Sequence, residues 1–285
     1  MKLSIIVTAT LIFMVCAAGI SYAQGISWDS QYFSVSAYAK WWDDEVNVSD
    51  HVSNSDTQSA NPWSPPLTWP LNSSALTENN RLGYPIQYAE SNASFNETGI
   101  DSYTITLDTR AEDYAPYFPS TGSDAMARAT GTFDASFTAT QSLFIFDYDL
   151  EYSISALGTS SVVDFESLSS NDVMINLSVY SNTTEEAYYY DELLLASVVA
   201  VGDTGGAISD GNILTGSISV PVQVGDNISV ILELSEDARA EFASEAGNNT
   251  LTLNYSMAVA PEPISTVLFL AGGATFGFGA YRRKR

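Results

Sequence analysis

The sequence predicts an all-β protein, an antiparallel β-sandwich of jelly-roll-like topology. Two observations lead to this prediction: apolar and polar residues alternate along most of the chain, and short turn-forming segments separate the alternating runs. Alternation with a period of two gives a strand one buried face and one wet face. The segments VGDTGG, SDGN and VGDN supply the Gly, Asp and Asn residues that tight turns need.

The clearest alternating run is 144–154, where apolar residues occupy the even positions. Asp147, Asp149 and Glu151 occupy odd positions, so we expect all three to face solvent. The segment EDARAEFASEA, 236–246, fits either one helical turn or a strand. Strands are predicted around 33–37, 103–107, 133–139, 144–154, 173–179, 193–201, 218–224, 228–234 and 251–259.

Residues 41–99 depart from this pattern. The part up to Pro85 contains five prolines, four of the five tryptophans of the chain and little alternation. Because proline lacks the amide proton that a central strand needs, we expect a long irregular insertion in the sandwich. Such a segment would pack through its aromatic side chains.

Residues 1–23 have the three parts of a secretory signal peptide. Lys2 gives the positive start, an apolar stretch follows, and Ser-Tyr-Ala forms a small-x-small cleavage site. Cleavage is predicted between Ala23 and Gln24, so the protein is expected to be exported.

The domain expected at 24–260 contains no cysteine and is strongly acidic. Cys16 lies inside the predicted signal, and lipidation there is a minor alternative because Val15 is bulky for a lipobox. The domain has no thiol for a disulfide or a metal. Its five cations stand against 33 acids, a formal charge of −28. That charge repels nucleic acid and anionic lipid, which we exclude as partners.

Four tryptophans are the candidate glycan-binding residues, because exposed aromatic rings stack on the faces of sugars. Packing inside the protein or at an interface is the alternative, and it is the commoner role of aromatics in β proteins. The candidates are Trp41, Trp42, Trp63 and Trp69.

No catalytic or metal-binding motif is present. His51 is the sole histidine, and no G-x-S-x-G elbow accompanies it. Asp147, Asp149 and Glu151 repeat about every 6.5 Å along one strand face, too widely to converge on Ca²⁺. We therefore expect no enzyme activity, metal or cofactor. A secreted carbohydrate-active enzyme with a carboxylate pair stays as the alternative, although 33 acids make such pairs unspecific.

The segment 261–285 joins a Pro-Glu-Pro triplet, an apolar stretch and a basic end. Its apolar part, 264–281, would span about 27 Å as a helix, close to the minimum for a bilayer core. We therefore expect a single C-terminal transmembrane helix, which by itself would be a plain anchor. Four cations, expected to stay on the cytoplasmic side as a stop-transfer cluster, follow it: Arg282, Arg283, Lys284 and Arg285.

This order of triplet, apolar segment and basic cluster, together with the N-terminal signal, resembles the PEP-CTERM sorting signal of Gram-negative envelope proteins. Pro261, Glu262 and Pro263 match the recognition triplet of that family, whereas Ile264 departs from the small residue often found next. The resemblance covers only about the last 25 residues. It implies that an exosortase, a membrane-embedded transpeptidase-like enzyme, removes the tail and releases or transfers the domain to the surface.

These features together predict an exported cell-surface or extracellular-matrix protein that is sorted by an exosortase. The expected role is adhesion or association with exopolysaccharide. The expected partners are the exosortase, the inner membrane during export, and exopolysaccharide. A plain C-terminally anchored surface protein is the other alternative beside the secreted enzyme.

Overall fold

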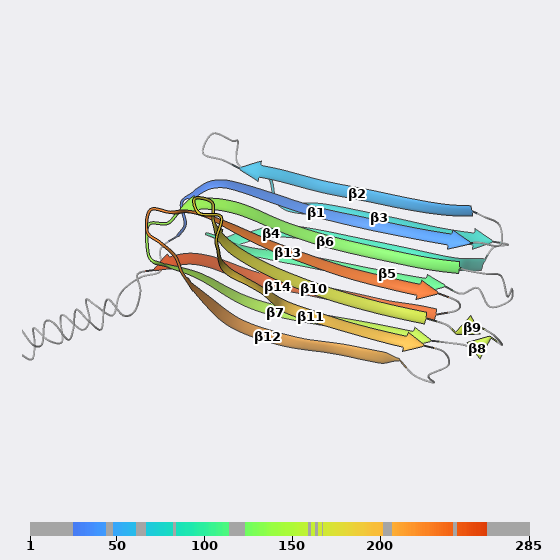
Figure 1. The fold of residues 1–285 in the computed structure, drawn as a ribbon. Coiled ribbons are helices and arrows are strands. Elements are labelled where there is room, and N and C mark those ends of the chain that lie inside the picture. Colours follow the sequence, from blue (N-terminus) through green and yellow to red (C-terminus); the bar gives the residue numbers. More distant parts are fainter. Residues whose placement is uncertain are drawn as a thin grey trace, which may run out of the picture.

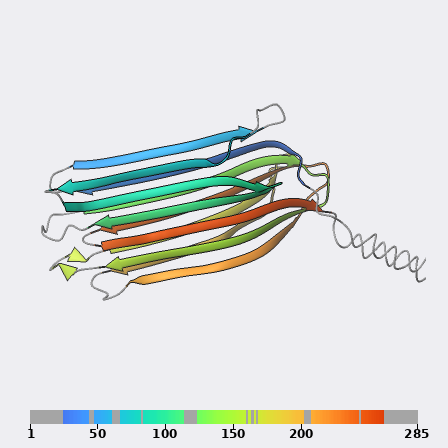
Figure 2. The ribbon, with the colours of Figure 1, turned by 180° about the vertical axis from the view of Figure 1, so that it is seen from behind.

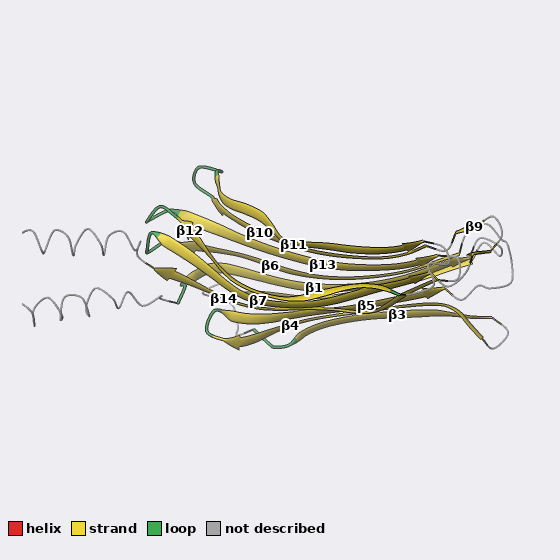
Figure 3. Ribbon diagram, turned by 90° about the horizontal axis from the view of Figure 1, so that it is seen from below, coloured by secondary structure: helices red, strands yellow, loops and turns green. Residues whose placement is uncertain are grey.

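Two six-stranded antiparallel sheets pack face to face and contain most of the residues that the structure describes (Figure 1, Figure 3). Neighbouring strands in both sheets run antiparallel throughout. The computed structural model describes residues 25–43, 48–60, 67–81, 84–113, 123–158, 161–162, 165–166, 168–201, 207–241 and 244–260.

The first sheet has the strand order β11-β10-β13-β6-β1-β2 and the second β12-β7-β14-β5-β4-β3. The strands of the first sheet are β11 (Ala187–Val201), β10 (Leu168–Ser181), β13 (Asn227–Glu241), β6 (Ser123–Thr138), β1 (Trp28–Asp43) and β2 (Val48–Ala60). Those of the second are β12 (Ile208–Pro221), β7 (Leu143–Gly158), β14 (Ser244–Ala260), β5 (Ser102–Asp113), β4 (Tyr84–Gly99) and β3 (Leu71–Arg81). A small hairpin joins β8 (Ser161–Val162) to β9 (Phe165–Glu166).

Eight of the strands have the order of a jelly roll, with β5-β14-β7-β12 in one sheet and β6-β13-β10-β11 in the other. The remaining four strands extend the two sheets: β1 and β2 follow β6, and β4 and β3 follow β5. The last two strands fill central places: β13 lies between β10 and β6, and β14 between β7 and β5. Figure 2 shows the second sheet from behind.

The expected irregular insertion at 41–99 is wrong, because this segment forms β2, β3 and β4. The apolar pattern did not indicate β3 and β4 because most of the side chains that they bury are small, and none of the side chains described on β2 is buried. Ala75, Ala89 and Ala93 are buried, and so are Ser73 and Ser91. Within 236–246, which fitted a helical turn or a strand, residues 236–241 belong to β13 and 244–246 to β14.

The expected transmembrane helix is not part of the fold that the structure supports. The described residues contain no helix, and none of them forms a segment that could cross a membrane as a helix. The predicted span 264–281 lies outside the described residues. The fold class is therefore corrected to an all-β protein with two packed sheets.

The space between the sheets has an aromatic part and an alanine part. Near the start of β1, Phe33 packs edge-on to Phe95 at 5.1 Å between ring centroids and to Trp69 at 4.9 Å. Near the end of β1 a separate cluster contains only alanines: Ala37, Ala39, Ala75, Ala89, Ala111, Ala125, Ala127, Ala238, Ala240 and Ala246.

Small side chains let the two sheets come close together at the alanine end. Gln87 Nε2 on β4 donates to the main-chain oxygen of Trp42 at 2.6 Å. Ser91 Oγ on the same strand donates to the main-chain oxygen of Tyr38 at 3.0 Å. These bonds join the two sheets, because β4 of the second sheet binds the main chain of β1 at Tyr38 and Trp42.

Candidate binding face on the first sheet

The outer face of β1 carries aromatic and cationic side chains. Its odd residues, such as Phe33 and Val35, are buried between the sheets, so its even residues point outward. Outward residues of β1 are Tyr32, Ser34, Ser36, Tyr38, Lys40 and Trp42.

Strand register places an arginine beside Tyr38. Tyr38 pairs with Ser53 of β2 on one side and with Arg128 of β6 on the other. Arg128 in turn pairs with Asp237 of β13, and its Nε donates a hydrogen bond to that carboxylate. An aromatic ring, a guanidinium and a hydroxyl therefore share one row across the sheet.

The next row adds two further cations, Lys40 and Arg239. Lys40 pairs with His51 of β2 and with Met126 of β6, and Met126 pairs with Arg239 of β13. No hydrogen bond or ion pair joins Lys40 to another residue that the structure describes. Trp42 begins the following row and has 37% of its surface exposed.

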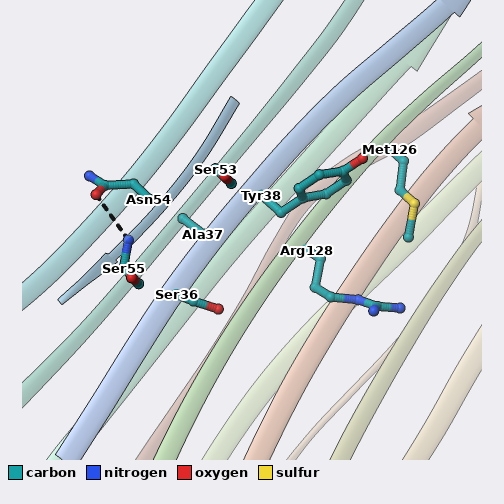
Figure 4. A pocket seen from close by; sticks show the side chains of 8 residues that line it. All are labelled: Ser36, Ala37, Tyr38, Ser53, Asn54, Ser55, Met126 and Arg128. Carbon is teal, nitrogen blue, oxygen red and sulfur yellow. Dashed lines mark hydrogen bonds between the residues drawn. The ribbon is translucent and has the colours of Figure 1, made fainter. Parts of the chain in front are cut away.

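A hollow of about 580 Å³ lies over the Tyr38 row. This volume is within the range of small-molecule pockets. Figure 4 shows the Tyr38 ring and the Arg128 side chain on neighbouring strands, with the serines of β1 and β2 to one side. The lining residues are Ser36, Ala37, Tyr38, Ser53, Asn54, Ser55, Met126 and Arg128.

Both arginines of this face are ion-paired with acids of neighbouring strands. Arg239 Nη2 lies 3.0 Å from Asp124 and 2.6 Å from Glu241. The hydrogen bond to Asp237 raises the pKa of Arg128, and the bond to Asp124 raises the pKa of Arg239. Three of the five cations of the domain, Lys40, Arg128 and Arg239, lie here. The acids Asp237, Asp124 and Glu241 hold the two guanidinium groups in place.

The structure does not gather the four tryptophans into one surface. Trp41 is only 7% exposed, and its neighbour Trp42 points to the opposite face of β1. Trp69 is partly buried and stacks on Phe95 of the core, with 5.7 Å between ring centroids. Trp63 lies outside the described residues. Of the three described tryptophans among the candidates, only Trp42 belongs to the candidate face.

The other expected site residues lie outside the part of the chain that the structure describes. Within the described ranges, no group of three or more His, Cys, Asp or Glu side chains could hold a metal ion. The residues that fall outside are Ala23 and Gln24, the sorting triplet Pro261, Glu262 and Pro263, and the basic residues Arg282, Arg283, Lys284 and Arg285.

A second, smaller hollow of about 250 Å³ lies on the second sheet. Glu90 and Asp108 both line it, together with Arg110. Burial, and then the nearby charge of Glu90, raises the pKa of Asp108. The Arg110 guanidinium lies 5.2 Å from the centre of the Tyr88 ring, and burial and the hydrogen bond to Glu90 raise the pKa of Tyr88 to about 12.

Sequence reasoning missed Tyr38, Lys40, Arg128 and Arg239. The alternation in QYFSVSAYAKWW contained part of the signal, because it places Tyr38 and Lys40 opposite the buried Val35. Arg128 and Arg239 could not be joined to them, since their strands lie far away in the sequence. Only the pairing of β1, β6 and β13 brings the four side chains together.

Comparison with known proteins gives weak similarities. No protein-family model matches the chain, and no curated protein matches it. The TmCBM61 structure in complex with beta-1,4-galactotriose is 12% identical, covers 57% of this chain and 72% of its own, and has a TM-score of 0.19. The CBM22-1-CBM22-2 tandem domain of Paenibacillus barcinonensis Xyn10C is 6% identical and covers 86% of this chain and 82% of its own, with a TM-score of 0.16.

The GH31 alpha-xylosidase of Xanthomonas citri is 6% identical. It covers 65% of this chain, 28% of its own chain is matched, and the TM-score is 0.15. TM-scores this low establish no shared fold. The function is therefore argued from the geometry of this chain.

Proposed function

We propose that this protein is an exported, non-catalytic polysaccharide-binding protein of the bacterial cell surface or extracellular matrix. Its binding site is the outer face of the first sheet around Tyr38 and Arg128. The observation that supports the proposal is the hollow of about 580 Å³ that these two side chains line. Aromatic rings stack on sugar C–H faces, while guanidinium groups donate paired hydrogen bonds to sugar hydroxyl or carboxylate oxygens.

The lining of the hollow favours binding over hydrolysis. Glycoside hydrolases use two carboxyl groups that flank the scissile bond. Among the described residues that line this hollow, none is an aspartate or a glutamate. Serine and asparagine side chains supply the remaining polar contacts, as a binding site for hydroxyl-rich chains requires.

The test is retention on the exopolysaccharide of the producing bacterium, measured by affinity electrophoresis. Tyr38→Ala and Arg128→Ala should each weaken binding by about five- to tenfold, which corresponds to a loss of about 1 kcal/mol. Tyr32→Ala is the matched control: Tyr32 lies on the same face of β1 and is 42% exposed, but it is about 20 Å away along the strand. Undiminished retention of a Tyr38→Ala, Arg128→Ala double variant that melts like the wild type would refute the proposal.

A secreted carbohydrate-active enzyme is the second candidate, favoured only by Glu90 and Asp108 in the smaller hollow. Incubation of the protein with the same polysaccharide, followed by measurement of new reducing ends, separates the two functions. Binding without hydrolysis supports the first. Release of reducing ends that Asp108→Asn abolishes would replace it with the second.

The sorting of the protein is the other part of the proposal. We expect Glu262 to be extended, because Pro263 disfavours a helical conformation at the residue before it, and Pro261 to keep a following helix from extending back into the domain. An exosortase could bind such a stretch and cleave there. We expect Glu262→Ala to accumulate an uncleaved precursor in the inner membrane fraction, and deletion of 282–285 to impair retention before processing.

Mass spectrometry of the mature protein from its host measures this processing. Peptides from 264–281 should be missing from the wild-type surface form and present in the Glu262→Ala form. Their recovery from the wild-type surface form would show that the tail is kept, and the sorting proposal would then be wrong.

A further inference from the structure

One edge of the sandwich, formed by β11 and β12, is rich in exposed apolar side chains. β11 ends the first sheet and β12 ends the second, so among the described strands neither pairs on its outer side. The lower part of Figure 1 shows both strands at this edge. Six of the exposed large apolar side chains belong to these two strands: Tyr190, Leu195, Val199 and Val201 on β11, and Ile208 and Ile213 on β12.

At the opposite edge, polar contacts join β2 to β3 and to the residues just before β3. Gln58 of β2 exchanges hydrogen bonds of 2.7 and 2.8 Å with the main chain of Thr68, just before β3. Thr77 of β3 donates to Asp50 of β2 at 3.2 Å. Polar and charged side chains at an edge discourage pairing with another chain. The two edges of the molecule are therefore chemically different.

The two halves of β11 also differ from each other, in charge and in the regularity of their pairing with β10. Its first half contains Asp191 and Glu192, and its register with β10 is interrupted at Leu193 and at Tyr188. Bulges and charges are the usual protection of an edge strand. The second half, 194–201, runs in unbroken register with β10 and contains no charged residue, proline or glycine. This half presents a regular, unprotected edge.

Electrostatic repulsion restricts where two copies can touch. Each domain carries a formal charge of −28, so a contact between copies needs a surface without acids. Leu193 to Val201 is such a surface. Asp172 of β10 lies beside Ser197, but two Asp172 carboxylates across a paired β11 edge would be about 14 Å apart. That separation exceeds the screening length of about 8 Å at physiological salt.

We infer that 194–201 of β11 is a self-association edge, and that its partner is the same segment of a second copy. The strand pairs antiparallel with its counterpart about a two-fold axis at Ser197. This register places Leu195 beside the partner's Val199 on the outer face. Paired main chains and abutting apolar side chains then join the two first sheets into one continuous sheet.

The self-association edge lies at the other side of the first sheet from the β1–β2 binding face. A failure of one inference therefore leaves the other untouched, because the variants that test them are on different strands. A dimer joined at this edge would carry two binding faces, one from each copy. Such bivalence strengthens the retention of a polymer without any new contact to sugar.

Sedimentation velocity of the full chain measures the association. The wild type should form dimers, and raising the salt concentration should tighten them several-fold because salt screens the repulsion between copies. Val199→Lys should raise the dimer dissociation constant by about tenfold or more, since lysine removes the apolar contact with the partner's Leu195 and places a charge that must lose water at the paired edge. Val52→Lys on β2 is the matched control, with an exposed valine on the opposite edge strand, and should dimerise like the wild type.

Cross-linking tests the register. In a Cys16→Ala background, Ser197→Cys places two thiols opposite each other at the two-fold axis, within reach of a short bifunctional thiol reagent. Ser55→Cys on β2 is exposed as well and should remain monomeric. A wild type that stays monomeric at high salt would overturn the inference. So would equal cross-linking of the two cysteine variants, or a Val199→Lys variant that melts normally and dimerises as tightly as the wild type.

Discussion

At the scale of single residues, Glu236 is the most unusual side chain. It lies on β13, faces the second sheet, and has 0% of its surface exposed. Neither carboxyl oxygen has a hydrogen-bond partner among the described residues. Burial, followed by the charges of Asp108 and Asp237, raises the pKa of Glu236 to about 9. The carboxyl group is therefore protonated in the folded protein at neutral pH.

Glu236→Gln should stabilise the protein at neutral and alkaline pH. In the unfolded chain Glu236 loses its proton near pH 4.5, whereas in the folded state it does so near pH 9. Between these values the folded state binds one more proton, so stability falls as pH rises, by about 3 kcal/mol at pH 7. Glutamine stays neutral and removes this loss, while it changes little below pH 4.5.

Urea unfolding at pH 4.5 and pH 8 checks this expectation. The gain from Glu236→Gln should be small at the lower pH and several-fold larger at the higher one. Glu233→Gln is the control, because Glu233 lies on the same strand but is exposed. An equal gain at both pH values would show that ionisation of Glu236 is not the cause.

At the scale of one element, β7 confirms the expected alternation. Phe144, Phe146 and Leu150 are buried at 0 to 1% exposure, while Asp147 and Asp149 are exposed. Phe146 also stacks on Tyr255 of β14 with 5.5 Å between ring centroids. The exposed acids make no metal cluster with their described neighbours. The face of β7 that carries charge is a solvated face.

Phe146→Ala should lower the free energy of unfolding by about 3 to 5 kcal/mol, since it removes a buried ring and leaves a cavity. Asp149→Asn, on the opposite face of the same strand, should change it by less than about 0.5 kcal/mol. Denaturant titration of both variants measures the difference. A large effect of Asp149→Asn would mean that this carboxylate has a structural partner, contrary to its exposure.

At the scale of the whole molecule, the last two strands hold both sheets together. Without β13, the pair β11–β10 would be separated from β6–β1–β2. Without β14, the pair β12–β7 would be separated from β5–β4–β3. These strands are the last of the described chain, so neither sheet can be completed until nearly the whole domain is present. Such long-range pairing makes folding slow.

A chain that ends at Asp226 should therefore fail to fold, whereas one that ends at Ala260 keeps every described strand and should fold. The measurements are near-ultraviolet circular dichroism and cooperativity of thermal unfolding. The longer chain should show a native spectrum and one sharp transition, and the shorter chain neither. A sharp transition in the shorter chain would contradict the central role of β13 and β14.

Much of the fold could be predicted from local pattern, and the reason lies in side-chain size. The runs at β6, β7 and β13 alternate large apolar residues with polar ones, which identifies strands without any partner. The strands β3 and β4 were missed because the residues they bury are mainly alanine, serine and threonine, and β2 was missed because none of its described side chains is buried. Such small residues carry little hydrophobic signal, and they suffice only where two sheets approach closely.

The sequence by itself determined that the domain is all-β, acidic and free of cysteine, because alternation and composition are local properties of the chain. The tertiary structure alone decided which side chains share a face. Trp41 and Trp42 are adjacent in sequence but point to opposite sides of β1, whereas Tyr38 and Arg128 are 90 positions apart and lie in one row. Strand register, set by burial across two whole sheets, produces such rows, and no segment of the chain contains that information alone.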